Sequence, residues 1–417
     1  MIYFGGHSCL ELKLMLTSIL HILFWLIFSY CAISVLYLLV LALGGRFLFN
    51  GKYNGVSAQP KTKIAVLVPA YKEDNIILST ARYLLEIDYP SSLIDIYIIA
   101  DSFQADTLER LKKLPLQVIE VSFDKSTKTK SLNEAFSRIS DHYDLALICD
   151  ADNILHRDFL RRLDYAFTLG ARSMQGRRVA KNLDSSFAIL DACSEGINNN
   201  IFRKGANGLG LSSAVIGSGM AFEYHRLKSI LANIKAIGGF DKILQLEIVS
   251  DDDKIRYLDK ALIFDEKIDS SSAFTEQRKR WVASQFMYLR RFFVPAVSKL
   301  FKGNLSYFNL AIGNNLVLPR AFLLMLLPAL VVAGLFLPLP FLVSAIVLLA
   351  LYMLTLGIAL PGELVTKDLF TAMMRLPTAL GSMFLALLHM KKAKSSFIHT
   401  VHTKTEVTNT LFNDHGN

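Results

Sequence analysis

Two carboxylates, one residue apart, follow a short apolar run in the first half of the chain. Asp150 and Asp152 come directly after the run Leu145–Cys149. Alternate side chains of an extended segment point to the same side, so both carboxylates can face one ligand. Carboxylate oxygens suit Mg²⁺ or Mn²⁺, and such an ion can bridge a diphosphate. A polar loop that merely follows a strand has the same composition, so the pair alone leaves both interpretations open.

An acidic run later in the chain could supply a proton acceptor. Asp251, Asp252 and Asp253 follow Ser250. Adjacent carboxylates repel one another, and removal from water raises the pKa of a carboxyl group. A carboxylate of raised pKa suits a general base that takes a proton from a hydroxyl. The alternative is a solvated turn or a helix N-cap, where Asp is common.

A Trp beside a basic cluster and a pair of glycines could contact a phosphorylated sugar. Gln277, Arg280 and Trp281 lie within the segment TEQRKRW, and the chain has only 2 Trp. An indole packs on the apolar face of a sugar ring, and a guanidinium group binds phosphate oxygens. A helix at a membrane surface with a Trp anchor is the alternative. Gly217 and Gly219 permit unusual backbone angles and let a ligand approach the main chain.

The elements that must position these residues alternate between strands and helices. Short apolar runs occur at 64–68, 94–100, 116–121 and 145–149, with segments of helical period between them. This alternation predicts a mostly parallel sheet with helices on both faces, which binds ligands beyond the carboxyl ends of its strands. Polar residues follow those ends: Tyr71, Glu73, Asp101, Asp124, Asp150 and Asp152.

Uncharged segments predict that the chain also enters a membrane. Charged residues make up 19% of the chain and apolar ones 52%, whereas soluble domains average about 25% charged. Residues 14–45 lack charge and are long enough for one tilted span. This segment is longer than the apolar core of a cleaved signal peptide, so we expect a retained anchor. Residues 321–362 are also uncharged and are broken by Pro338 and Pro340, which predicts a hairpin of two spans. Leu376–Met390 is shorter, so an interfacial, re-entrant or crossing segment remains open there.

The placement of the positive charge predicts an orientation. The net charge is +9, and cations cluster after the first uncharged segment, before the second and after Met390. If all three clusters are cytoplasmic, the chain crosses three times and its N-terminus is outside. Membrane flanks then account for much of the charge, which argues against a nucleic-acid partner. The four cysteines show no paired spacing, so we expect neither a disulfide framework nor a zinc site.

The motifs occur in a characteristic order along the chain. Pro69-Ala70-Tyr71 and Asp101 are followed by Lys128 with Asn133 five residues later, and then by the pair of carboxylates. The Gly-x-Gly-Met segment, the acidic run and Gln-x-x-Arg-Trp come next. This order resembles the family 2 glycosyltransferases, specifically the membrane-integrated branch that includes cellulose, hyaluronan and poly-N-acetylglucosamine synthases. The resemblance covers about residues 60–285.

The resemblance implies a fold and a division into parts. The fold is a GT-A-like, Rossmann-type mixed α/β sheet with helices on both faces, together with an α-helical transmembrane part. The expected parts are an anchor at 1–50, a cytoplasmic glycosyltransferase domain at 51–282, amphipathic interfacial helices at 283–320, a transmembrane hairpin at 321–362 and an interfacial or re-entrant segment with a tail at 363–417.

The resemblance also implies roles for individual residues. Asp150 and Asp152 would bind the metal, and Asp252 would be the catalytic base, preceded by Asp251. The chain has Ser-Asp-Asp where the family has Thr-Glu-Asp, so Asp253 is the alternative base. The residues implied to bind substrate are Pro69, Ala70, Tyr71, Glu73, Asp101, Lys128, Asp150, Gly217, Ser218, Gly219, Met220, Asp251, Gln277, Arg280 and Trp281.

The expected activity is an inverting, metal-dependent transfer from a UDP-sugar. Mg²⁺ or Mn²⁺ would be the cofactor, and the acceptor a hydroxyl of a growing polysaccharide or glycan at the cytoplasmic face of the plasma (inner) membrane. Transfer of one sugar to a lipid acceptor is the enzymatic alternative, and a transporter or scaffold the alternative from another class. The sequence leaves open the donor sugar, the linkage, the oligomeric state and any secretion partner.

Overall fold

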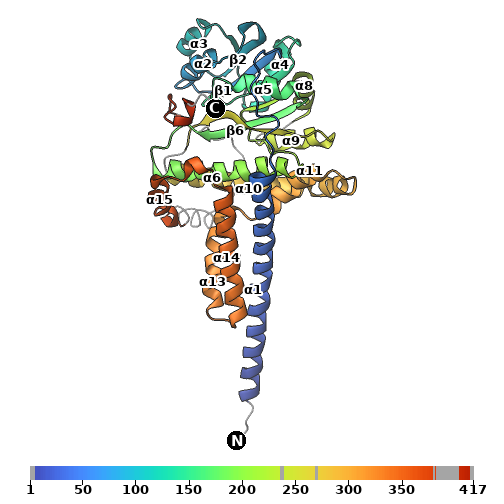
Figure 1. Cartoon of the computed structure of the whole chain (residues 1–417), viewed down its shortest axis with the longest axis vertical. Coiled ribbons are helices and arrows are strands. Elements are labelled where there is room, and N and C mark those ends of the chain that lie inside the picture. The colour runs from blue at the N-terminus through green and yellow to red at the C-terminus, as the bar shows by residue number, and fades with distance from the viewer. Residues whose placement is uncertain (1–4, 235–238, 268–270, 379–380, 382–402, 414–417) are drawn as a thin grey trace.

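The computed structural model describes residues 5–234, 239–267, 271–378, 381 and 403–413, and describes side chains within these ranges except at 5–10 and 271–284. An α/β part lies at one end of the molecule, and long helices extend away from it (Figure 1). A layer of helices that run crosswise separates the two.

One mixed sheet of eight strands forms the α/β part, in the order β3-β2-β1-β4-β7-β6-β8-β5. The strands β1 to β4 are parallel, β7 is antiparallel to both neighbours, and β6 and β8 are parallel. The predicted sheet with helices on both faces is confirmed, and its four predicted strands are β1 to β4. The bounds are β1 Ile64–Tyr71, β2 Ile94–Asp101, β3 Gln117–Val121, β4 Leu145–Ile148, β5 Ile154–Leu155, β6 Ser173–Ala180, β7 Met220–Glu223 and β8 Arg256–Asp265.

Both faces of β1 are covered because its side chains alternate between two cores. Val66 and Val68 pack with one group of helices, and Ala65 and Leu67 pack with another. A parallel strand that is buried on both faces is apolar throughout, which explains the near-continuous apolar run. The first group is α2 Ile77–Leu85, α3 Ala105–Lys112 and α5 Phe159–Thr168; the second is α4 Lys128–Arg138, α8 Tyr224–Asn233 and α9 Phe240–Ser250.

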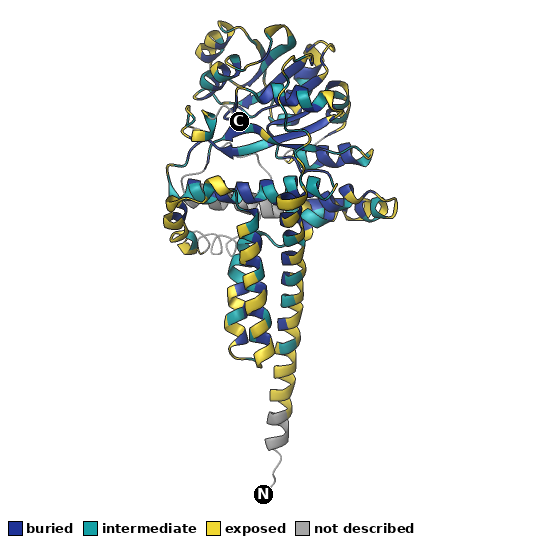
Figure 2. Cartoon of the chain, viewed as in Figure 1, coloured by how far each residue is buried: buried dark blue, intermediate teal, exposed yellow. Residues whose placement is uncertain are grey.

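Three apolar helices extend from the α/β part: α1 Gly5–Leu43, α13 Arg320–Gly334 and α14 Leu339–Ala359. Two helical segments, Glu11–Leu48 and Leu339–Ala359, are long and apolar enough to cross a membrane. The shorter α13 follows the helical segment Leu305–Leu316, and the two are bent by 52° relative to each other. If this bent pair is a single span, it is the third. Their outward faces are exposed (Figure 2), as lipid-facing surfaces are.

The crosswise layer contains α6 Ser186–Asn198, α10 Ser271–Phe301, α11 Leu305–Phe308 and α15 Lys367–Met373 (Figure 1). Large apolar side chains of α10 are exposed, including Phe286, Phe293 and Val294. Such a helix suits the boundary between water and lipid. Apart from residues 376–378 and 381, the segment Leu376–Met390 lies outside the described residues.

The last described segment returns to the sheet. The N–H of Thr408 donates to Lys181 O at 3.0 Å, and Asn409 Nδ2 donates to Ala180 O at 2.7 Å. The ring of Phe412 lies 5.3 Å from that of Phe264 in β8 and 5.7 Å from that of Tyr83 in α2. Residues 403–413 therefore pack on the α/β part, although apolar helices separate the two in the sequence.

Candidate functional site

The carboxyl ends of β1 and β2 form one side of the candidate site. Tyr71 and Asp101 lie opposite each other at the last positions of the two strands, and Pro69 and Ala70 precede Tyr71 in β1. Asp101 is 1% exposed and accepts a hydrogen bond from Ser102 at Oδ1, but its buried Oδ2 has no partner within the described part of the chain. A buried acceptor without a partner is costly, so a ligand that donates to it is favoured.

The backbone is strained just beyond both strands. Lys72 and Ser102 have φ of 54° and 59°, in the left-handed region that side chains disfavour. The N–H of Lys72 donates to Asp101 O at 3.1 Å, which ties the two turns together. Such strain costs about 1–3 kcal/mol per residue and clusters at functional sites. Glu73 follows directly, and its carbonyl accepts the N–H groups of Ile76 and Ile77.

Three of the predicted segments converge beside β4. Lys128 is the first residue of α4, and its ammonium forms an ion pair with the Asp150 carboxylate. The same ammonium donates to Gly217 O at 2.7 Å, and the N–H of Asp150 donates to Ser218 Oγ at 2.9 Å. The structure therefore brings together the lysine predicted to bind substrate, the first Asp of the pair and the glycine segment.

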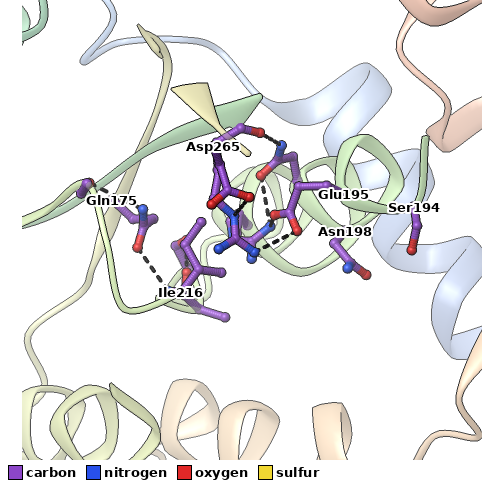
Figure 3. Close-up of polar contacts among 12 residues, drawn as sticks. Gln175, Ser194, Glu195, Asn198, Ile216 and Asp265 are labelled. Carbon is purple, nitrogen blue, oxygen red and sulfur yellow. Dashed lines mark hydrogen bonds and ion pairs between the residues drawn. The ribbon is translucent and has the colours of Figure 1, made fainter. Parts of the chain in front are cut away.

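The glycine segment is held by a residue that the sequence analysis missed. Gln175 of β6 is fully buried, and its Nε2 donates to Gly176 O and Ser218 O, both at 2.9 Å (Figure 3). Its Oε1 accepts the N–H of Ile216 at 3.1 Å. One amide thus fixes the segment on two sides, while Gly217 and Gly219, with φ of 84° and 61°, make its turns. Met220 begins β7, and its fully buried side chain lies in the core.

The second carboxylate, Asp152, is 8% exposed. Its Oδ2 accepts from Asn153 Nδ2 at 3.0 Å, and its carbonyl accepts from Lys181 Nζ at 2.7 Å. No group of three or more potential metal ligands occurs among the residues that the structure describes. Two carboxylates still fit Mg²⁺ or Mn²⁺, because such ions are commonly held by one or two carboxylates together with substrate phosphates and water.

The predicted catalytic triplet lies at the C-terminal end of α9. Asp252 has φ of 61°, and its Oδ1 accepts from Asn304 Nδ2 at 2.8 Å. Asp253 accepts from Arg226 at 2.8 Å and from Ser173 Oγ at 2.9 Å. The side chain of Asp251 is 76% exposed and approaches Arg226 at 3.3 Å. The triplet therefore anchors the turn after α9 to its neighbours.

The opposite end of α9 borders the converging segments. Lys128 Nζ lies 5.5 Å from the ring centroid of Phe240, the first residue of α9. Asp241 is the next residue and is partly exposed. A helix rises about 1.5 Å per residue, so the nine steps from Asp241 to Ser250 span about 14 Å. Asp241 is thus a second candidate base, which sequence reasoning missed because it followed the acidic run and not the helix start.

The remaining predicted residues divide into two groups. Asn133 lies in α4, and its Nδ2 donates to Leu231 O in α8 at 3.0 Å, so it joins two helices. Gln277, Arg280 and Trp281 fall in α10, but their side chains lie outside the described residues. Their predicted contacts with substrate stay predictions.

A mixed sheet that carries an Asp-x-Asp loop at its strand ends defines the GT-A class of glycosyltransferases. A family described as "Glycosyltransferase like family 2" matches residues 60–284, which is more than half of the chain. The chain belongs to this family, whose members use nucleotide sugars. No curated protein matches the chain.

Solved structures of glycosyltransferases are similar at low identity. A mannosyltransferase from Pyrobaculum calidifontis, in complex with GDP-Man and Mn²⁺, is 16% identical, with a TM-score of 0.46 over 87% of this chain and 100% of that one. TarS of S. aureus with UDP-GlcNAc is 17% identical, with a TM-score of 0.36 over 50% and 59% of the two chains. Glucosyl-3-phosphoglycerate synthase of Mycobacterium tuberculosis with Mn²⁺ and UDP is 14% identical, with a TM-score of 0.36 over 53% and 78%.

Proposed function

We propose that the protein is an inverting glycosyltransferase that moves a sugar from a UDP-sugar to a hydroxyl of a growing polysaccharide or glycan. The carrying observation is the convergence of Lys128, Asp150 and Gly217 at the carboxyl ends of the parallel strands. The reaction would take place at the cytoplasmic face of the plasma (inner) membrane, with three crossings and the N-terminus outside.

The donor would lie across the strand ends. Tyr71 and Asp101 would face the nucleoside, whose hydroxyl and N–H groups can donate to Asp101 Oδ2, which has no partner among the described residues. Lys128 would approach the diphosphate from the start of α4, where the helix dipole also favours negative charge. A divalent cation held by Asp150 and Asp152 would offset the charge that builds on the departing diphosphate.

The chemical step is a single displacement at the anomeric carbon. The acceptor oxygen forms a bond to that carbon, the bond to the diphosphate breaks, and a carboxylate takes the hydroxyl proton. The resemblance assigns this carboxylate to Asp252, whereas the position of α9 favours Asp241. Asp252 is bound to Asn304 at the far end of the helix, whereas Asp241 directly follows Phe240, whose ring centroid lies 5.5 Å from Lys128 Nζ.

Two matched variants separate these assignments. Asp241→Asn is expected to keep UDP-sugar binding and to lower turnover by about 10²–10⁴-fold, because general-base catalysis contributes that much. Asp252→Asn is expected to keep turnover near the wild-type level. UDP release and UDP-sugar binding are measured on membranes that contain each variant. If Asp252→Asn loses turnover and Asp241→Asn keeps it, the base is Asp252. If both variants keep wild-type turnover, neither residue is the base.

The activity itself is tested by a screen of nucleotide sugars. Membranes that contain the wild-type chain should release UDP from at least one UDP-sugar, and EDTA should suppress the release. No UDP release with any donor and acceptor would refute the proposed function. Release of GDP alone, from GDP-sugars, would replace the proposed donor class.

Transfer of one sugar to a lipid acceptor is a second candidate. The observation that favours it is the crosswise layer, whose exposed Phe286 and Phe293 would set the site against lipid. In the described part of the chain, only two helices, or three with the bent pair, are long enough to span a membrane, which leaves little material to line a polymer path. Product analysis by chain length decides, because one sugar per acceptor identifies the lipid reaction.

A further inference from the structure

Asn153, which directly follows the Asp-x-Asp pair, bridges two carboxylates. It is fully buried, and its Nδ2 donates to Asp152 Oδ2 at 3.0 Å and to Asp265 Oδ1 at 3.1 Å. A side-chain amide nitrogen carries two protons, so one group can serve both acceptors. The carboxylate plane of Asp152 is therefore oriented by Asn153, and Asn153 is oriented by Asp265.

Asp265 is itself fixed at the end of β8. Lys267 Nζ binds its Oδ2 at 2.8 Å, and the Arg178 guanidinium lies 3.8 Å from the same oxygen. These cations keep a second negative charge near Asp152 compensated, since two unpaired carboxylates in a buried place would repel. Its Oδ1 thus remains available as an acceptor for Asn153.

A buried ion cluster connects Asp265 to the crosswise layer (Figure 3). Arg178 donates to Glu195 of α6 at 3.0 Å, and Arg203 binds the other oxygen of Glu195 at 3.1 Å. The helix α6 is in turn held by Arg320 at the start of α13, which donates to Ser194 O at 2.8 Å and to Asn198 Oδ1 at 2.9 Å. Contacts therefore run without interruption from an apolar helix to Asp152.

We propose that Asn153 and Asp265 are positioning residues that orient the Asp152 carboxylate toward a divalent cation. The proposal rests on the proposed function, because it assumes that Asp152 binds metal. Groups that hydrogen-bond a metal ligand fix its orientation, and their loss commonly costs about 10–100-fold in metal affinity. The membrane-side helices thereby help to hold the metal site.

The test measures Mn²⁺ affinity on the full chain in detergent, in the presence of UDP, from the electron paramagnetic resonance signal of free Mn²⁺. Asn153→Ala is expected to bind Mn²⁺ about 10–100-fold more weakly. Asp265→Asn, which keeps the side-chain shape, is expected to weaken binding in the same direction. Thermal unfolding of each variant is recorded alongside, so that a loss of fold is recognised.

Asn315→Ala is the matched control. Asn315 is also buried, at 9% exposed, and its Nδ2 donates to Leu310 O and to Ala311 O, both at 3.0 Å. Like Asn153, it serves two acceptors with one amide nitrogen, but these acceptors lie outside the network of Asp152 and Asp265, so the Mn²⁺ affinity of the variant should equal that of the wild type. An equal loss in Asn315→Ala and Asn153→Ala would overturn the proposal, because both would then act through general stability.

The reference variant Asp152→Ala separates this proposal from the proposed function. If Asp152→Ala abolishes Mn²⁺ binding while Asn153→Ala and Asp265→Asn bind normally, the positioning role is refuted and the proposed function stands. If wild-type chain with UDP binds no Mn²⁺, the metal dependence of the proposed function fails and the positioning role fails with it. If Asn153→Ala does not fold, Asp265→Asn alone decides, and unchanged affinity in it refutes the proposal.

Discussion

Two joints connect the apolar helices to the sheet, and they are opposite in kind. At the end of α1, Gly44 packs against Gly205 and Gly208 of the segment after α6, backbone against backbone. A Cβ at Gly205 would overlap Leu41 O, and one at Gly208 would overlap Gly44 O. At the other joint, Glu195 sits between two arginines. The glycine joint depends on the absence of atoms, whereas the ionic joint depends on the presence of charge.

The ionic joint should be the more sensitive of the two to a single substitution. Burial alone would raise the pKa of the Glu195 carboxyl, but Arg178 and Arg203 lower it well below its usual range. Glu195→Gln removes that charge, leaves the buried Arg203 without its carboxylate partner and leaves Arg178 with Asp265 at 3.8 Å. We expect the free energy of unfolding to fall by about 3–5 kcal/mol, measured as a lower thermal midpoint in detergent.

The control replaces Glu195 and its two arginine partners with apolar residues. Replacement of a complete buried ion group by well-packed apolar side chains is often neutral or stabilising. The triple variant Glu195→Leu, Arg178→Met and Arg203→Met is therefore expected to unfold at a higher temperature than Glu195→Gln. A triple variant less stable than Glu195→Gln would mean that the ion pairs stabilise the protein more than apolar packing at these positions does.

The glycine joint should respond to an added methyl group. Gly205→Ala forces the two backbones apart, and overpacking of this kind costs about 1–3 kcal/mol, sometimes more. Thermal unfolding of the purified chain measures the loss. Gly357→Ala is the control, because a Cβ at Gly357 of α14 meets nothing within 4 Å and alanine favours a helix by up to about 1 kcal/mol. If both variants lower the thermal midpoint equally, the close backbone contact at Gly205 is not the cause of the destabilisation.

The smallest effect is expected where the ionic joint reaches α14. The hydroxyl of Tyr352, which is fully buried, donates to Arg320 O at 2.9 Å. Tyr352→Phe keeps the ring and removes this bond, which typically costs about 0.5–1.5 kcal/mol. The change should appear as a small shift in the thermal midpoint with unchanged UDP release. A shift as large as that of Glu195→Gln would place Tyr352 within the essential part of the joint.

The strands β1 to β4 could be predicted because they are buried on both faces and are therefore apolar without interruption. The strands β6 to β8 could not. For example, β6 carries Arg177 and Arg178, whose charges are compensated by Glu363 and Glu195 from distant parts of the chain. The alternation of apolar and polar residues that marks a strand in the sequence is lost when buried strand residues are charged and find their partners only in the tertiary fold.

The candidate site was predictable to the extent that its residues form local motifs. Asp150 and Gly217 stand in recognisable segments, and the order of those segments suggested that they meet. Gln175 and Asn153 act through hydrogen bonds to main chain or to carboxylates far along the sequence, and no spacing rule reveals such contacts. Asp241 was missed because it resembles any acid in a first helical turn, and only the contact of the preceding Phe240 with Lys128 distinguishes it.

The return of residues 403–413 to the sheet means that residues from both sides of the apolar helices in the sequence complete one α/β part. Lys181 Nζ, beside Asp152, is covered by Lys404 O at 2.8 Å, and Phe412 closes the aromatic group around Phe264. Domains generally begin to fold while the chain is still emerging from the ribosome. Here residues 403–413 are made after α1, α13 and α14, so their contacts with Lys181 and Phe264 form only once these three helices have been synthesised.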